Sequence, residues 1–260
     1  MRVTILGGLG GYPTAHEGCN AFLVERDGFR LLVDPGYATL QPLLSRVGAA
    51  DVDAVWISHG HPDHCADLQP LLRARALAAT TGSHPPAQRL PVIAPARALD
   101  PLLALDPPDT VEDAYLLREV GDGEAFDVGP FRLEVRDLPH MVPNLGVRIS
   151  AAATVLAYTG DCGPSPAVAE LAADADLLIA NATFADEMPA AWKVNLSSAR
   201  QAGGYADAAR AKALVLTHLW PGVAAADALD AARDTYAGPV YVATTGLTLD
   251  VPATAVAGER

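Results

Sequence analysis

Three histidines and one aspartate lie within six consecutive residues of this 260-residue chain, between His59 and His64. The surrounding stretch, residues 58–65, reads Ser-His-Gly-His-Pro-Asp-His-Cys. Imidazole nitrogens and carboxylate oxygens are ligands that zinc, manganese and iron accept in proteins. His59 and His61 can point one way, whereas Asp63 and His64 come from the turn that follows and can point another. The stretch can therefore serve two adjacent metal ions.

The cluster directly follows an apolar run at residues 54–57, which predicts a buried strand. Its side chains would then lie at the carboxyl end of that strand, where the chain leaves the sheet and turns. Solvated histidines in an ordinary polar turn are the alternative. That alternative suits a single histidine better than three histidines and an aspartate in such close spacing.

Three more ligand-type residues, His140, Asp161 and His218, each come just after a predicted strand. The strands concerned are residues 131–138, 154–158 and 213–216. One such residue would more often cap a turn. Three of them, together with the cluster at 59–64, favour ligands that converge on one rim of a sheet sandwich.

The seven residues divide into two sets and a bridge. One metal ion would be bound by His59, His61 and His140, the other by Asp63, His64 and His218, and both by the two oxygens of Asp161. Each ion keeps an open position for a shared water, as a catalytic site requires. Water between two divalent cations is substantially ionised at neutral pH and is a ready nucleophile. We assign the catalytic roles to Asp63 and Asp161.

Composition limits the class of substrate and the cellular compartment that we expect. The formal net charge is -13 and no basic stripe is visible, which disfavours a large nucleic acid and leaves a small anionic molecule as the substrate. Three cysteines form no disulfide framework. The first residues run straight into a strand pattern without a signal peptide or a long apolar span. We expect a cytoplasmic protein without membrane contact, and a homodimer remains open.

The order of the predicted elements is strands and then helices, in both halves of the chain. This order indicates an α/β fold with two face-to-face sheets, helices outside, and a single domain over residues 1–260 with a two-part core. Predicted strands cover residues 3–6, 20–25, 30–33, 54–57, 91–94, 125–128, 131–138, 146–150, 154–158, 176–180, 213–216 and 239–243, and predicted helices cover residues 40–47, 67–79, 99–105, 111–117, 167–172, 197–211 and 224–236.

Residues 58–64, Ser-His-Gly-His-Pro-Asp-His, resemble the H-x-H-x-D-H signature of the metallo-β-lactamase superfamily. His140, Asp161 and His218 occur in the order and contexts of its remaining ligands. The resemblance covers nearly the whole chain. It implies an αβ/βα four-layer sandwich with two divalent metal ions, usually zinc, and manganese or iron as alternatives.

A narrower resemblance is to the ribonuclease Z-like branch, carried by Pro139-His140, Tyr158-Thr159-Gly160-Asp161 and Leu216-Thr217-His218. That branch includes tRNA 3′-processing enzymes and cyclic-nucleotide phosphodiesterases, so it implies phosphodiester hydrolysis. Where the branch usually has a glutamate and a histidine that relay a proton to the leaving oxygen, this chain has Asn181 and Asn195. An amide donates a hydrogen bond but delivers no proton at neutral pH.

Three hypotheses about function follow. The first is a zinc-dependent dinuclear hydrolase in which a metal-bound hydroxide attacks a small anionic substrate, with a phosphodiester as the first choice. The second is an acyl hydrolase that opens a lactone, a thioester or a related bond on the same site, because such leaving groups depend less on protonation. The third is a metal-binding protein without turnover, which the intact ligand set argues against.

Several residues near the predicted rim have both a functional and a structural interpretation. Asp34 either orients a metal ligand or forms a turn before Pro-Gly. Ser197 and Ser198 either help to hold an anion or cap a helix, and capping is the simpler interpretation. The glycine-rich residues 7–11 lack the ending of a phosphate-binding P-loop and suggest a flexible loop over the site.

The remaining candidates are weaker as site residues. Cys65 and Cys162 each follow a ligand, but small buried residues are expected there. His16 could reach the mouth of the site and is not assigned as a ligand, while His84 lies in a polar loop and is expected to be solvated. Trp192 and Trp220 could line the pocket, with core packing as the default.

Overall fold

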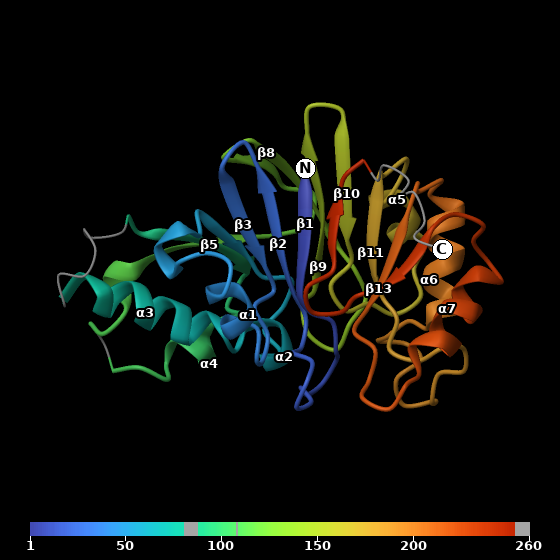
Figure 1. The fold of residues 1–260 in the computed structure, drawn as a ribbon, viewed down its shortest axis with the longest axis horizontal. Coiled ribbons are helices and arrows are strands. Elements are labelled where there is room, and N and C mark those ends of the chain that lie inside the picture. Colours follow the sequence, from blue (N-terminus) through green and yellow to red (C-terminus); the bar gives the residue numbers. More distant parts are fainter. Residues whose placement is uncertain (81–87, 108, 253–260) are drawn as a thin grey trace.

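The computed structural model describes residues 1–80, 88–107 and 109–252, and within them the chain forms two seven-stranded sheets packed face to face (Figure 1). Helices cover the outer face of each sheet. This arrangement confirms the αβ/βα four-layer sandwich. The predicted loop that contains His84 lies outside the described residues.

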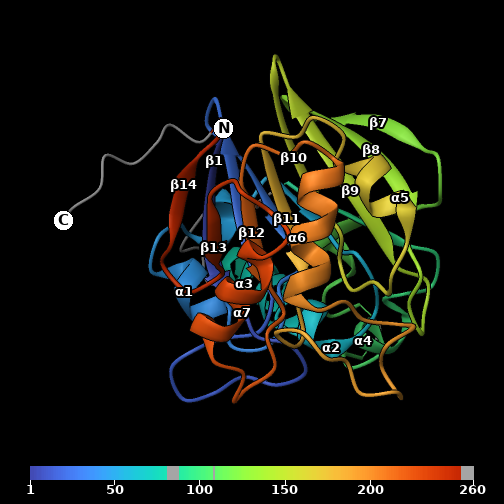
Figure 2. The same cartoon turned by 90° about the vertical axis from the view of Figure 1, so that its right-hand side faces the viewer.

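The first sheet is built from the amino-terminal half of the chain and one late strand. Its strands are β1 (Arg2–Gly7), β2 (Ala21–Arg26), β3 (Phe29–Val33), β4 (Ala54–Trp56), β5 (Leu90–Pro95), β6 (Tyr115–Val120) and β14 (Thr248–Asp250). They lie in the order β14-β1-β2-β3-β4-β5-β6. The pairs β3–β4, β4–β5 and β5–β6 are parallel. β14 runs antiparallel beside β1, which is visible in Figure 2.

The second sheet follows in the sequence and lies in the order β13-β12-β11-β10-β9-β8-β7. Its strands are β7 (Ala125–Val128), β8 (Phe131–Asp137), β9 (Leu145–Ala151), β10 (Thr154–Tyr158), β11 (Leu177–Asn181), β12 (Leu214–Thr217) and β13 (Val240–Val242). The strands from β7 to β10 pair antiparallel with their neighbours in sequence order, β7 with β8, β8 with β9 and β9 with β10. The strands from β10 to β13 are parallel to one another, each beside the next.

The helices divide between the two outer faces, with those of the first half beside the first sheet and α5, α6 and α7 beside the second (Figures 1 and 2). The helices are α1 (Leu40–Leu44), α2 (Pro62–Cys65), α3 (Leu68–Thr80), α4 (Asp100–Leu103), α5 (Pro166–Leu171), α6 (Ala199–Ala208) and α7 (Ala225–Arg233), with 3-10 turns at Ala49–Asp51 and Glu112–Ala114. No helix in the described part of the chain is both long and apolar enough to cross a membrane.

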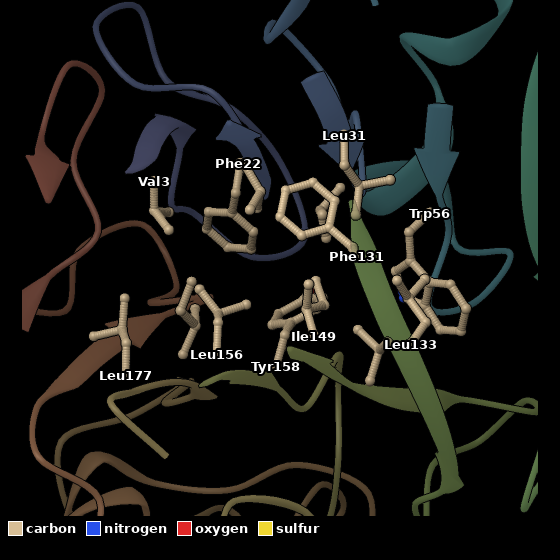
Figure 3. Close-up of a cluster of buried hydrophobic side chains, with 14 of the residues drawn as sticks. Val3, Phe22, Leu31, Trp56, Phe131, Leu133, Ile149, Leu156, Tyr158 and Leu177 are labelled. Atoms are coloured by element: carbon tan, nitrogen blue, oxygen red, sulfur yellow. The ribbon is translucent and has the colours of Figure 1, made fainter. Parts of the chain in front are cut away.

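Three clusters of buried apolar side chains fill the spaces between the four layers. The central cluster lies between the sheets, where Phe22, Leu31 and Trp56 of the first sheet face Leu133 and Ile149 of the second (Figure 3). Alternation along β8, with every second residue buried, places one face of that strand in this core. The other two clusters lie between each sheet and its helices, so the packing between the two sheets rests on the central cluster.

Two predictions about the first sheet were wrong. Residues 111–117 were expected to form a helix, but only a short 3-10 turn forms there and β6 follows. β6 pairs with all six residues of β5, and this pairing satisfies backbone groups that β5 would otherwise leave exposed. β14 was not predicted. It is three residues long and is defined by its pairing with β1, so its own sequence carries little strand signal.

The parallel strands decide where the candidate site lies. β3, β4, β10, β11 and β12 all have their carboxyl ends at the same edge of the sandwich, which is the edge where ligands bind in open α/β sheets. β8 runs in the same direction as β10, because both are antiparallel to β9. The residues that follow these strands therefore meet at one rim.

Candidate metal centre

The residues after β4 turn sharply at this rim. Pro62 occupies the first turn of the one-turn helix α2, where its missing N–H costs nothing, and the turn reverses the direction of the side chains. His59 and His61 lie before the turn, and Asp63 and His64 lie within it. His59 and His64 are fully buried, and Asp63 is 8% exposed.

The first group of converging ligand atoms belongs to His59, His61, His140 and Asp161, which lie within 4.8 Å of one another. His61 Nδ1 lies 3.1 Å from His59 Nε2 and 3.2 Å from His140 Nε2. Nitrogen ligands of a tetrahedral zinc ion are about 3.3 Å apart, given zinc–nitrogen distances of about 2.0–2.1 Å. The spacing of the three ring nitrogens thus fits one metal ion.

The second group consists of Asp63, His64 and His218. His218 Nε2 lies 3.3 Å from Asp63 Oδ2, and His64 Nε2 lies 3.8 Å from the same oxygen. The structure therefore brings together the same two sets of three residues that the sequence suggests. Their role as ligands stays a prediction.

Asp161 lies between the two groups. Its Oδ1 is 3.3 Å from His64 Nε2, and its Oδ2 is 3.0 Å from His218 Nε2. The same Oδ2 is 3.9 Å from the Nε2 atoms of both His59 and His140. One buried carboxylate thus contacts histidines of both sets, as a bridging ligand would.

Hydrogen bonds on the far side of the rings set the direction of the free lone pairs. His140 Nδ1 donates to the carbonyl oxygen of Asn195 at 2.8 Å, and His64 Nδ1 donates to Asp34 Oδ2 at 2.8 Å. Ser58 Oγ donates to Asp34, so it accepts from His59 Nδ1 at 3.0 Å. The pKa values of His59 and His140 are lowered by burial, so these rings are neutral, carry the proton on Nδ1 and offer the Nε2 lone pair to the centre. Against the effect of burial, the carboxylates of Asp161 and Asp63 raise the pKa of His64, whose Nδ1–H is likewise held by its hydrogen bond to Asp34.

The electrostatics of the centre favour bound cations. Burial lowers the pKa of His59 well below its usual value, and also lowers the pKa values of His61 and His140. Burial opposes charge on His218 as well, but the carboxylates of Asp161 and Asp63 together outweigh it and raise the pKa of His218 to about 9. Two buried carboxylates therefore attract positive charge, which divalent ions can supply.

The seven donor residues assigned from the sequence, five imidazoles and two carboxylates, fit divalent cations, and a third converging group joins Asp34 to His59 and His64. The nitrogen and oxygen donors suit zinc, manganese or iron. Three of the histidines are oriented from behind by hydrogen bonds, which reduces the cost of ordering them when a metal binds.

The glycine-rich loop after β1 packs tightly onto this centre. The backbone N–H of Gly11 donates to Asp63 Oδ2 at 2.6 Å. A Cβ on Gly10 would stand only 2.4 Å from atoms of the His218 ring, so no larger residue fits there without displacement. A loop over the site was predicted, and the structure places it in direct contact with two of the ligand-type residues.

The other candidates are placed as follows. Asp34 does orient a ligand-type residue, through its hydrogen bond to His64. Ser198 is the N-cap of α6, with its hydroxyl accepting from the backbone N–H of Gln201, so the capping interpretation is confirmed. His16 is exposed and belongs to none of the converging groups of described residues.

The cysteines are buried and do not join the converging groups of described residues. Burial raises the pKa values of Cys65 and Cys162 to about 12, so both remain thiols at neutral pH. Cys65 Sγ donates to the carbonyl oxygen of His61 at 3.3 Å. They behave as small core residues, as expected.

Asn181 and Asn195 have different surroundings. The Asn181 amide donates to Asp161 Oδ1 at 3.2 Å, and its carbonyl oxygen accepts from the backbone N–H of Ser197 at 2.7 Å. Asn181 therefore holds the carboxylate of Asp161 in place. Asn195 contributes its backbone carbonyl to His140.

Sequence reasoning missed two buried polar residues behind the centre. Tyr158 Oη donates to Asp34 Oδ2 at 2.7 Å across the interface of the two sheets. Asn20 Nδ2 lies 3.4 Å from His64 Nε2, and Asn20 Oδ1 accepts from Thr217. The available signal was a hydroxyl or amide in an otherwise apolar strand, which needs a partner when buried.

A groove of about 460 Å³ opens beside His61. Most of its wall is made of small apolar residues, namely Ala96, Ala98, Pro101, Val142 and Pro143. Arg97 stands at its edge, where its side chain is 85% exposed and pairs with Asp100 at 3.0 Å. A substrate at the centre thus has room for one substituent and a cation within reach.

Comparison with known proteins agrees with this geometry. A model of the β-lactamase superfamily domain matches residues 29–219. The chain is 31% identical to the probable metallo-hydrolase YhfI of Bacillus subtilis, over 84% of this chain and 87% of that protein. It is 30% identical to ribonuclease Z of Haloarcula marismortui, over 95% of this chain and 96% of that protein. The crystal structure of YhfI, a metallo-beta-lactamase fold protein, is similar with a TM-score of 0.86 and 26% identity, and the similarity covers 96% of this chain and 99% of that chain. The chain therefore belongs to the metallo-β-lactamase superfamily of metallo-hydrolases and has ribonuclease Z proteins among its relatives.

Proposed function

We propose that this protein is a zinc-dependent hydrolase with two metal ions, and that its substrate is a small anionic phosphodiester. The observation that carries the proposal is the position of Asp161, whose two oxygens contact histidines from both groups. A single structural ion would need no shared carboxylate between two sets of ligands. Names of relatives support hydrolysis, and ribonuclease Z supports a phosphodiester.

Each group of residues has a defined task in this proposal. One ion would be held by His59, His61 and His140, the other by Asp63, His64 and His218, and both by Asp161. When bound, such ions bind and polarise a substrate oxygen and lower the pKa of water. The protein's own contribution is orientation: Asn181 holds Asp161, the Gly11 N–H holds Asp63, and Asp34 holds His64. Arg97 can contact an anionic substituent that occupies the groove.

The charge of the chain supports a small substrate. With a net charge of -13, the surface repels a polyanion over most of its area, whereas two divalent ions attract a single phosphate locally. The relatives named ribonuclease Z nevertheless leave an RNA substrate open. An assay series should therefore include a short RNA beside small phosphodiesters.

The test is metal content together with hydrolysis. Protein purified without chelator should contain close to two metal ions per chain and should hydrolyse bis(4-nitrophenyl) phosphate. Asp161→Asn should lose both metal and activity, while Asp174→Asn, an exposed aspartate paired with Arg210, should retain both. An Asp161→Asn variant with full metal content and activity would refute the bridging role, and wild type without metal after zinc addition would refute the site.

An acyl hydrolase is the second candidate, and Asn181 is the observation that favours it. Its amide is committed to Asp161 and to the Ser197 N–H and holds no proton to deliver. A positioned general acid contributes about 10²–10⁴-fold, mainly for poor leaving groups.

If the protein cleaves phosphodiesters without such an acid, we expect kcat/KM for aryl phosphodiesters to be far higher than for alkyl ones. The double variant Asn181→Glu, Asn195→His should lower this ratio of the two kcat/KM values. Lactone or thioester turnover without any phosphodiester turnover would decide for the acyl hydrolase.

A further inference from the structure

Three aromatic side chains near the rim belong to none of the three core clusters. Phe184, Trp192 and Trp220 are partly buried and pack on one another instead. The ring centroids of Phe184 and Trp220 are 5.1 Å apart, and those of Trp192 and Trp220 are 5.4 Å apart. Two of the chain's three tryptophans thus lie together outside the cores, while Trp56 is fully buried between the sheets.

This aromatic group is attached to the candidate metal centre at two points. Trp220 comes two residues after His218, and its backbone N–H donates to the carbonyl oxygen of Thr183, whose hydroxyl lies 3.1 Å from His218 Nδ1. Trp192 begins the turn that ends at Asn195, the residue whose carbonyl oxygen accepts from His140. The group therefore connects the segments that position one histidine of each metal-binding set.

The glycine-rich loop brings Trp220 still closer to the centre. A Cβ on Gly11 would stand 3.7 Å from Trp220 Nε1, and the Gly11 N–H donates to Asp63. Gly11 alone thus lies between the indole of Trp220 and the carboxylate of Asp63. Trp220 is therefore the aromatic residue of this group that lies nearest to the candidate metal centre.

We propose that Phe184, Trp192 and Trp220 form an aromatic shelf that stacks against a planar ring, such as a purine base, carried by the substrate. The proposal rests on the proposed function, because the substrate's phosphate is what places the ring at the shelf. Large aromatic residues left partly exposed lose burial energy, and a bound ring restores it. Stacking also suits an acidic protein, because a ring's π-face adds no charge to be repelled.

The first experiment compares two phosphates that differ only in the base. Calorimetric titration of zinc-loaded protein should show adenosine 5′-monophosphate binding about tenfold or more tightly than ribose 5-phosphate. In Trp192→Leu and in Trp220→Leu that ratio should fall to near one, with ribose 5-phosphate binding unchanged. Tyr115→Leu, a partly buried aromatic residue packed against the core of the first sheet, is the matched control and should keep the ratio.

The second experiment separates the shelf from phosphate chemistry. Adenosine carries the base without a phosphate, and at millimolar concentration it should quench the fluorescence of wild-type protein but not that of a Trp192→Leu, Trp220→Leu variant, whose Trp56 is shielded in the core. Absence of quenching in wild type, or an equal affinity for the two phosphates, would overturn the shelf even if bis(4-nitrophenyl) phosphate is hydrolysed. Quenching without phosphodiester hydrolysis would support the shelf and refute the proposed function.

Discussion

The carboxylate of Asp34 is fully buried behind the candidate metal centre and receives four donors. They are the Ser58 N–H at 2.6 Å, the Ser58 hydroxyl, the Tyr158 hydroxyl and His64 Nδ1. Through Ser58 it also sets the direction of the proton on His59. One side chain therefore orients a histidine of each candidate set, and a change there should act on both ions of the proposed site.

Asp34→Asn tests this influence at the residue scale. The asparagine amide has an NH₂ group in place of one carboxylate oxygen, and this group cannot accept a hydrogen bond. His64 or Ser58 would therefore lose the acceptor of its hydrogen bond. Loss of such an orienting group typically costs about 10–100-fold in metal affinity. Zinc affinity, measured by competition with a chromophoric chelator, should fall by that range, and the exposed Asp230→Asn should not change it. Equal affinities in both variants would show that Asp34 serves the fold alone.

At the scale of elements, the site depends on how strands end. Asp34 follows β3 with φ 46°, and His218 follows β12 with φ 64°, so two non-glycine residues at the rim have left-handed backbone conformations. Such conformations cost about 1–3 kcal/mol each and persist only where the surroundings enforce them. β3 pairs with β2 and β4, and the Asp34 N–H donates to the carbonyl oxygen of Trp56. β12 lies between two parallel strands, and the His218 N–H donates to Gly8 of the glycine loop.

Gly10→Ala tests the contact between the glycine loop and His218. The added Cβ would overlap the imidazole, so either the ring or the loop must move. A displacement of about 1 Å at a reacting centre can lower activity about 10²-fold. We expect such a loss, with reduced metal content. Gly204→Ala in α6 is the control, because a Cβ there meets nothing within 4 Å and should stabilise the helix slightly. Full activity in Gly10→Ala would mean that the loop moves freely.

At the scale of the whole molecule, the candidate ligands come from both sheets. His59, His61, Asp63 and His64 follow β4 of the first sheet, whereas His140, Asp161 and His218 follow β8, β10 and β12 of the second. Bound ions would therefore link the two halves of the sandwich at one edge, in addition to the central core. Metal removal should then be felt by the whole fold and not only by the loops.

Thermal unfolding with zinc and with a chelator checks this expectation. A ligand at about 100 times its dissociation constant stabilises the folded state by about 2.7 kcal/mol. For a protein of this size each kcal/mol raises Tm by about 2–4 °C. The zinc-loaded protein should thus melt about 5–10 °C higher in a single transition. A Tm that does not respond to zinc would contradict metal binding across the two sheets.

Local patterns in the sequence were sufficient for much of this description. Apolar runs bounded by turn residues predict strands such as β4, β10 and β12, because alternation and strand length depend on neighbouring residues. The spacing from His59 to His64 predicts metal-ligand chemistry, since few other constraints place three imidazoles and a carboxylate so close together. The resemblance to the metallo-β-lactamase superfamily rests on the same residues and is confirmed.

Other features depend on partners distant in the sequence, and only the tertiary structure decided them. β6 is a strand because β5 offers it a free edge, against the helical pattern of residues 111–117. Asp34 is an orienting residue because Tyr158, 124 positions away, and His64 meet it in the core. Trp192 and Trp220 lie outside the cores because the segments that carry them are fixed by His140 and by Thr183 beside His218. Residue types determine which chemistry is available, whereas side-chain contacts between the two sheets determine where it is assembled.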